Sequence, residues 1–244
     1  MNETTTHPRP WARIAWRGAV ILLAAALFIP LNQVVLFRFI DPPFTAMMLW
    51  KSLENLFQAE PVGWRHHNRP AGEISPHLLR AVIAAEDQRF FDHDGFDLIE
   101  IEKARQTHQR KPRKPLRGAS TLTQQAAKNL FLPPVRSFVR KGVEAYYTVL
   151  MELLWPKDRI LEVYVNVVEF APNVYGAEAA ARHHFRRDAS RLTRQQAALL
   201  AAVLPNPVRW SASRPTGYIS RRAARIVAEM PSVPGSQAEA GWRN

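Results

Sequence analysis

The sequence predicts a mainly α-helical domain that follows a single N-terminal transmembrane helix. An uncharged apolar run lies near the N-terminus, and the segments after it repeat apolar residues at helical spacing between proline and glycine residues. No alternating strand pattern of useful length is present. With 244 residues, 47% of them hydrophobic, the chain is long enough for one domain with a real core plus an appendage.

The predicted transmembrane anchor is residues 18–37, a stretch of 20 residues without a charge. A bilayer core of roughly 30 Å requires about this length, and Pro30 and the pair Asn32-Gln33 weaken the span without excluding it. Basic and indole side chains precede it: Arg9, Arg13, Arg17, Trp11 and Trp16. The positive-inside rule therefore predicts a cytoplasmic tail, 1–17, and an exported remainder. A cleaved signal peptide is the alternative, but no convincing cleavage site follows the apolar run.

The exported part begins with a juxtamembrane segment, 38–63, in which MMLWKSLENLF has amphipathic helical spacing. A loop containing proline and glycine leads into the main domain, 64–230, and a polar, flexible tail, 231–244, follows it. Ser75 and Pro76 have the N-cap and first-turn preferences of a helix that buries Leu78, Leu79, Val82 and Ile83. Further helices are predicted at 97–108, 120–129, 137–154, 158–168, 177–186, 193–203 and 219–230.

Positive charge is concentrated in one stretch of the chain. The formal charge is +12, from 33 basic and 21 acidic residues, yet no acidic residue lies between Glu102 and Glu144. This stretch predicts an anionic ligand, with an unliganded basic face as the alternative. The absence of cysteine excludes disulfides and Cys-based metal sites. The paired histidines His66-His67 and His183-His184 do not have metal-ligand spacing, and no nucleotide-binding fingerprint is present.

Three local patterns contain residues that could carry chemistry. Glu86-Asp87 ends an apolar helix, where partial desolvation would make a carboxylate a usable general base or acid; a solvated charge is the alternative. Residues 117–125 lead from a glycine through hydroxyl residues into a helix start, which favours anion binding or, alternatively, simple capping. Arg140, Lys141 and Glu144 lie within one helical turn and form either a phosphate site or a surface ion pair.

Five segments, in this order, resemble the five motifs of family 51 peptidoglycan glycosyltransferases. They are EDQRFFDHDGFD (86–97), RGASTLTQQAAKNLFL (117–132), RKGVEAYYTVLMELLWPKDRILEVYVN (140–166), EFAPNVYGAEAAARHHF (169–185) and LTRQQAALLAAVLPNPVRW (192–210). The resemblance covers about residues 64–230, and one departure is the glycine-poor loop 170–173. Since no room for a transpeptidase domain follows, the chain is similar to monofunctional biosynthetic transglycosylases of the proteobacterial type.

The resemblance implies a lysozyme-like fold with a cleft open to the membrane. The implied reaction joins a growing lipid-linked glycan to lipid II: the acceptor sugar 4-hydroxyl attacks the donor anomeric carbon with inversion, and polyprenyl pyrophosphate leaves. Glu86 matches the base of the family, and Glu144 matches a second essential carboxylate. The matching substrate-binding residues are Asp87, Ser120, Thr121, Gln125, Lys128, Asn129, Arg136, Arg140 and Lys141.

The resemblance also implies the setting in which the protein works. No cofactor is required and no metal ligands are evident. Assistance of the reaction by a divalent cation, Mg²⁺ or Mn²⁺, stays open. The expected partners are lipid II, the growing glycan, the membrane and possible cell-wall synthases and division proteins, without nucleic acid. The expected location is a bacterial inner membrane, single-pass, with a periplasmic catalytic domain. The competing hypotheses are a lytic enzyme of the same fold, an inactive cell-wall scaffold and a basic nucleic-acid binder.

Overall fold

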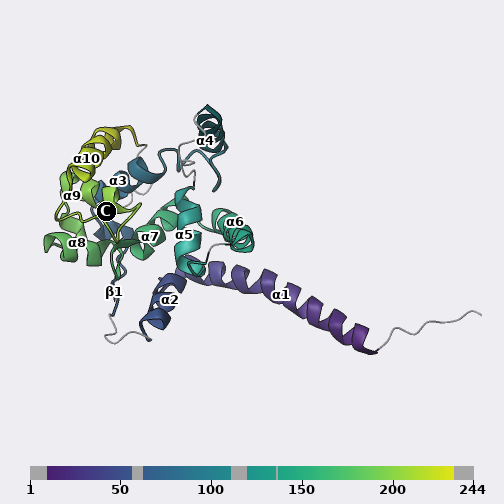
Figure 1. Cartoon of the computed structure of the whole chain (residues 1–244). Helices are drawn as coiled ribbons and strands as arrows, with labels where there is room; N and C mark the ends of the chain where they lie inside the picture. The colour runs from purple at the N-terminus through teal and green to yellow at the C-terminus, as the bar shows by residue number, and fades with distance from the viewer. Residues whose placement is uncertain (1–9, 57–62, 111–119, 136, 234–244) are drawn as a thin grey trace, which may run out of the picture.

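The computed structural model describes residues 10–56, 63–110, 120–135 and 137–233. Within these residues the chain forms a helical domain from which one long helix projects (Figure 1). The helices are α1 (Pro10–Phe39), α2 (Ala46–Asn55), α3 (Pro76–Glu86), α4 (Leu98–Arg110), α5 (Leu122–Phe131), α6 (Phe138–Leu154), α7 (Lys157–Val167), α8 (Ala177–Phe185), α9 (Arg194–Val203) and α10 (Gly217–Glu229). Single 3₁₀ turns lie at Ala71–Glu73, Ala189–Arg191 and Met230–Ser232. The mainly α prediction is confirmed, and most predicted helix ends differ from the observed ones by one to three residues.

Helix α1 contains the predicted anchor and extends beyond both of its ends. Its segment Arg13–Phe39 is long and apolar enough to cross a membrane, and most of its apolar side chains are exposed. Only its C-terminal part contacts the domain, where α1 packs against α6. There Gln33 accepts a hydrogen bond from the Tyr147 hydroxyl, and the Trp155 indole donates to the Val34 carbonyl at 2.8 Å. The polar residue that weakens the apolar pattern therefore has a partner.

The core forms around two groups of helices that α7 connects. Helix α3 packs against α9 and α10, while α5 packs against α6 and α7, and Figure 1 shows these groups on either side of α7. The four residues predicted to face inward from α3 are all buried, as expected: Leu78, Leu79, Val82 and Ile83. Ser75 is the N-cap, but its hydroxyl donates to the Leu192 carbonyl at 2.9 Å instead of accepting from its own helix.

A small sheet joins the segment after α2 to the segment after α7. Its strands are β1 (Arg65–His66), β2 (Glu169–Ala171) and β3 (Val174–Tyr175), in the order β1-β3-β2. Strand β3 pairs parallel with β1 and antiparallel with β2. Strands of two or three residues are too short to produce an alternating pattern, so the sequence does not predict them.

Gly176, at the start of α8, holds the end of this sheet against α7. Its φ is +84°, a conformation that side-chain-bearing residues rarely adopt, and an added Cβ would lie 2.6 Å from the Asn166 carbonyl oxygen. The backbone of α7 therefore lies so close to residue 176 that only glycine, which has no Cβ, fits at this position.

Gly176→Ala is expected to lower the free energy of unfolding by about 2 kcal/mol or more, because strain at positive φ adds to the clash with Asn166. Urea titration of the detergent-solubilised protein, followed by tryptophan fluorescence, measures this loss. The matched control is Gly142→Ala in α6, where an added Cβ meets nothing within 4 Å; it is expected to stabilise by about 0.5–1 kcal/mol. A Gly176→Ala protein as stable as the original would contradict the proposed packing.

Candidate active site

Glu86 ends α3 and places its carboxylate at the meeting point of three helices. Its Oε2 accepts a hydrogen bond from Gln125 Nε2 of α5 at 3.1 Å, and its Oε1 lies 3.2 Å from Arg222 Nη2 of α10. The side chain is 12% exposed. Burial raises the pKa of Glu86 above its ordinary value, and Gln125, Arg222 and Lys128 oppose that rise. Glu86 is therefore a desolvated carboxylate with defined partners, and the alternative of a freely solvated charge is wrong.

Gln125 is itself held by a buried phenol. The Tyr164 hydroxyl of α7 lies 3.2 Å from Gln125 Oε1. Complete burial raises the pKa of Tyr164 well above its usual value, so the phenol stays protonated. Its O–H donates a hydrogen bond to the amide oxygen of Gln125. This donor fixes the orientation of the amide, which turns its NH₂ group toward Glu86. The sequence predicted Gln125 as a ligand of sugar and phosphate, and the structure gives it a contact with the predicted base as well.

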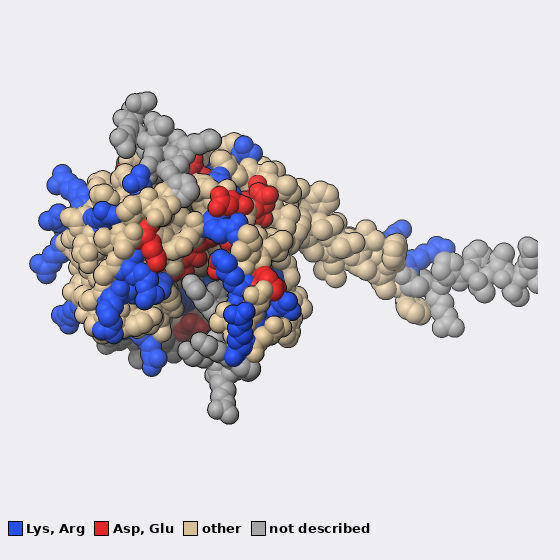
Figure 2. All heavy atoms as spheres, turned by 90° about the horizontal axis from the view of Figure 1, so that it is seen from above, with Lys and Arg blue, Asp and Glu red and all other residues tan. Residues whose placement is uncertain are grey.

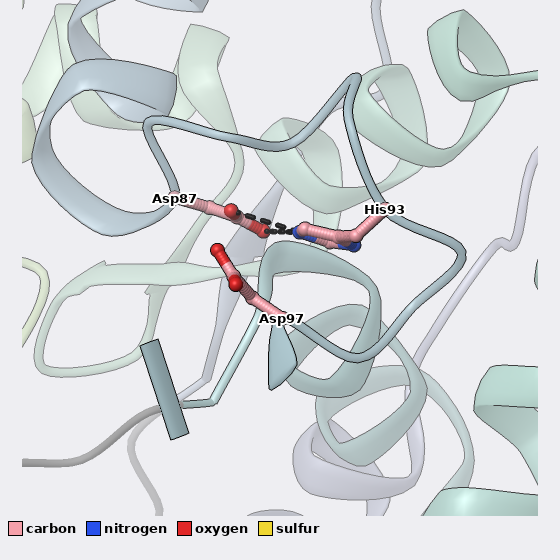
Figure 3. Close-up of side chains that lie close together, drawn as sticks. All are labelled: Asp87, His93 and Asp97. Carbon is pink, nitrogen blue, oxygen red and sulfur yellow. Dashed lines mark hydrogen bonds and ion pairs between the residues drawn. The ribbon is translucent and has the colours of Figure 1, made fainter. Parts of the chain in front are cut away.

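Asp87 joins the end of α3 to the beginning of α5. Its Oδ2 accepts from the backbone N–H of Leu122 at 2.9 Å, and its Oδ1 lies 3.0 Å from His93 Nε2. Figure 3 shows the imidazole directed at this carboxylate. The Gly95 N–H donates to His93 Nδ1 at 3.2 Å, so the proton of a neutral ring lies on Nε2 and is donated to Asp87. Asp87 is thus oriented from two sides.

Asp97 completes a group of three possible metal ligands, Asp87, His93 and Asp97, whose ligand atoms all lie within 4.8 Å of one another (Figure 3). Oδ1 of Asp97 accepts from the N–H groups of Ile99 and Glu100 at the start of α4. Among the described residues Oδ2 has no hydrogen-bond partner although it is buried. A cation on His93 Nε2 would force the ring proton onto Nδ1, against the Gly95 N–H. We therefore interpret this group as a hydrogen-bonded brace and assign no metal to it.

Glu144 lies in the second turn of α6 and is almost fully buried, with 3% of its side chain exposed. Its Oε2 accepts from Arg140 Nη1 at 2.9 Å, and its Oε1 accepts from Lys141 Nζ. The predicted grouping of these three residues is confirmed, and because Glu144 is buried the contact is not a surface ion pair. Arg140 Nε is buried and has no hydrogen-bond partner within the described parts of the chain.

Lys128 lies on α5 between the two predicted catalytic carboxylates. Burial lowers the pKa of Lys128 below its ordinary value; the charges of Arg140 and Lys141 add to this, whereas Glu144 and Glu86 oppose it. Its ammonium group interacts with both carboxylates. The structure therefore brings together the predicted residues Glu86, Gln125, Lys128 and the Arg140-Lys141-Glu144 group.

A cavity of about 690 Å³ opens beside Glu86, between the end of α3 and helices α4 and α10. Glu86, Asp87, Ser120 and Thr121 contribute to its lining. Figure 2 views this face from above, and basic and acidic side chains gather there around a hollow. The cavity gives Glu86 access from outside.

The remaining predicted binding residues differ in what the structure gives them. Ser120 is exposed at the cavity. Thr121 is buried and caps α5: it accepts from the Gln124 N–H at 3.2 Å and donates to the Gly95 carbonyl at 2.7 Å, so the capping interpretation is confirmed. Asn129 is partly buried beside Lys128. Arg136 lies outside the described residues.

Sequence reasoning missed Arg222, Tyr164 and the pairing of His93 with Asp87. Arg222 is 136 positions from Glu86 and lies among other basic residues of α10, so no spacing signals the contact. Tyr164 is 39 positions from Gln125 in a segment that reads as an ordinary apolar helix. His93 follows Asp87 by six residues, and only the loop geometry brings the two together.

Comparison with known proteins yields a consistent family assignment. A family model described as Transglycosylase matches residues 56–231, close to the predicted domain. The relatives include biosynthetic peptidoglycan transglycosylases of Shewanella oneidensis (52% identical, covering 88% of this chain and 90% of the relative) and Pseudomonas fluorescens (54% identical, 83% of each). Another, from Aeromonas hydrophila, is 51% identical over 90% of this chain and 92% of its own length. Buried carboxylates, a cationic helix turn and a match over most of its length thus agree that this chain belongs to the transglycosylase family.

Proposed function

We propose that this protein polymerises lipid II into peptidoglycan glycan strands. The observation that carries this proposal is a desolvated carboxylate, Glu86, beside a cationic group that Lys128, Arg140 and Lys141 form around Glu144. A base and a pyrophosphate site are the two parts that this glycosyl transfer requires. A lytic enzyme would need the carboxylate but would have no use for the cationic group.

Glu86 acts as the general base. A sugar hydroxyl is a poor nucleophile near neutral pH, and a carboxylate with a raised pKa is a better proton acceptor than an ordinary one. The 4-hydroxyl oxygen of the acceptor forms a bond to the donor anomeric carbon on the face opposite the leaving group. Its proton passes to Glu86, the bond from the anomeric carbon to the phosphate oxygen breaks, and polyprenyl pyrophosphate leaves with the electron pair.

The cationic group stabilises the negative charge that develops on the leaving pyrophosphate. Arg140 supplies the positive charge of its guanidinium, and Lys128 and Lys141 supply ammonium groups. Glu144 keeps the Arg140 and Lys141 side chains in place through its two oxygens. We assign Ser120, Asn129 and Arg136 to sugar and phosphate binding, on the strength of the family motif, whereas the hydroxyl of Thr121 caps α5.

Polymerisation needs no resident cofactor in this proposal. A divalent cation, Mg²⁺ or Mn²⁺, would assist by neutralising pyrophosphate oxygens that the basic side chains do not reach.

The domain works at the membrane surface from which its substrates extend. Exposed apolar residues on α4 and at the start of α6 support contact with lipid: Leu98 (73% exposed), Phe138 (98%) and Val139 (78%). Helix α6 lies beside the domain end of α1 (Figure 1). We infer an inner-membrane, periplasmic location from the arginines that precede the span, and we propose cell-wall synthases and division proteins as its partners there.

Glu86→Gln is expected to reduce lipid II polymerisation by roughly 10²–10⁴-fold, because the amide cannot accept the hydroxyl proton. Labelled lipid II and the detergent-solubilised protein, with products separated by length, provide the measurement. Glu73→Gln makes the same chemical change at a side chain that is 57% exposed and should retain full activity. Cleavage of preformed strands without polymer formation by the unaltered protein would favour the lytic hypothesis instead.

The pH profile of polymerisation is expected to have two limbs with opposite causes. On the acid side activity falls as Glu86 gains a proton, and the limb lies above the ordinary carboxyl pKa because the pKa of Glu86 is raised. On the alkaline side activity falls as Lys128 loses its proton, below the ordinary lysine pKa because the pKa of Lys128 is lowered. Lys128→Arg, which stays charged, should move only the alkaline limb upward. An unmoved alkaline limb would refute the role given to Lys128.

A further inference from the structure

Arg222 reaches the predicted base from the far end of the chain. It lies on α10, the last α-helix described, and its Nη2 lies 3.2 Å from Glu86 Oε1 and 3.5 Å from the Ala85 carbonyl oxygen. Its side chain is 26% exposed, and it lines the cavity beside Glu86. The contact therefore sits at the side of Glu86 from which an acceptor could approach.

The arginine and Gln125 hold opposite oxygens of one carboxylate. Arg222 contacts Oε1, while Gln125, oriented by Tyr164, donates to Oε2. Two donors on two oxygens fix the plane of the carboxylate. Each oxygen keeps a further lone pair that can accept a proton.

The groups that face Glu86 come from four elements. Lys128 approaches from α5, Arg222 from α10, the neutral phenol of Tyr164 from α7, and Asp87 follows Glu86 in the chain. The ammonium group of Lys128 interacts with Glu144 as well as with Glu86, whereas Arg222 forms an ion pair with Glu86. An arginine keeps its charge at every working pH, so it always favours the ionised form of Glu86.

One nitrogen of the Arg222 guanidinium takes no part in the contact with Glu86. Its Nε is buried and has no hydrogen-bond partner within the described parts of the protein, and such an atom costs free energy.

We propose that Arg222 is a positioning residue that keeps Glu86 ionised and directed at the acceptor hydroxyl. Burial by itself would favour the protonated, inactive acid, and the fixed charge of Arg222 counteracts that preference without donating or accepting a proton in the reaction. This proposal rests on the role of Glu86 as base.

The test compares Arg222→Gln, Arg222→Lys and the control Arg221→Gln in full-length, detergent-solubilised protein. Arg221 precedes Arg222 on α10, is exposed and does not line the cavity. For each variant the kcat and KM for lipid II polymerisation are measured across pH, and the thermal unfolding midpoint is recorded.

Arg222→Gln is expected to move the acid limb of kcat/KM upward by about one pH unit, because a nearby positive charge has been removed. Arg222→Lys should keep the limb within about half a unit of the unaltered protein but lower kcat severalfold, because an ammonium on a shorter, more flexible side chain does not hold the carboxylate in the same position. Arg221→Gln should match the unaltered protein, and KM should change little in all three variants.

An unmoved acid limb in folded Arg222→Gln, or a loss confined to KM, would overturn the proposal. Should Arg222→Gln fail to fold, Arg222→Lys decides: full kcat in that variant overturns it, and a severalfold loss with an unmoved limb supports it. Activity of Glu86→Gln distinguishes a failure of the base assignment from a failure of the role proposed for Arg222. If Glu86→Gln stays active, the base assignment itself is wrong; if it is inactive and the Arg222→Gln limb is unmoved, only the role of Arg222 fails.

Discussion

The hydrogen bond from the Leu122 N–H to the Asp87 carboxylate determines the geometry of the site. It connects the last turn of α3 to the first turn of α5, and His93 holds the same carboxylate from the loop between α3 and α4. With those two helix ends joined, Glu86 faces Gln125 one turn along α5, and Lys128 lies one turn further on. The contacts of Glu86 with Gln125 and Lys128 depend on this junction.

The two predicted catalytic carboxylates are both largely shielded from solvent, with 12% of the Glu86 side chain and 3% of the Glu144 side chain exposed, but they differ in their surroundings. Glu86 has one ion pair and one amide donor, and burial is the largest influence on its pKa. Glu144 has two cations within hydrogen-bond range, which stabilise its negative charge. One carboxylate is thus suited to accept a proton, and the other to organise positive charge. Lys128 couples them, since it interacts with both.

Local pattern was enough to predict most of the helices and to mark three groups of candidate residues, whose functional roles came from the resemblance. The buried face of α3 and the Arg140-Lys141-Glu144 turn follow from helical spacing within one segment. The resemblance then supplied Glu86 as base, and the structure leaves only 12% of its side chain exposed. By contrast, the contacts of Arg222 and Tyr164 with the site join helices far apart in the sequence, and no periodicity encodes which helices meet. The short sheet escaped prediction because pairing distant segments, not alternation, creates it.

The attachment of α1 to the domain has a consequence for how substrate is met. The Tyr147 and Trp155 side chains fix the C-terminal part of α1 to α6, and Arg159 of α7 adds hydrogen bonds to the Phe37 carbonyl oxygen. A helix held at several points cannot swivel against the domain it carries. With α1 as the membrane anchor that we propose, the tilt of this helix in the bilayer would therefore set the height and the orientation of the cavity above the lipid surface. Lipid II would diffuse in the same membrane, with its head group on the side of the domain. Enzyme and substrate would then meet already oriented, and they would need less rotational search than two freely tumbling molecules.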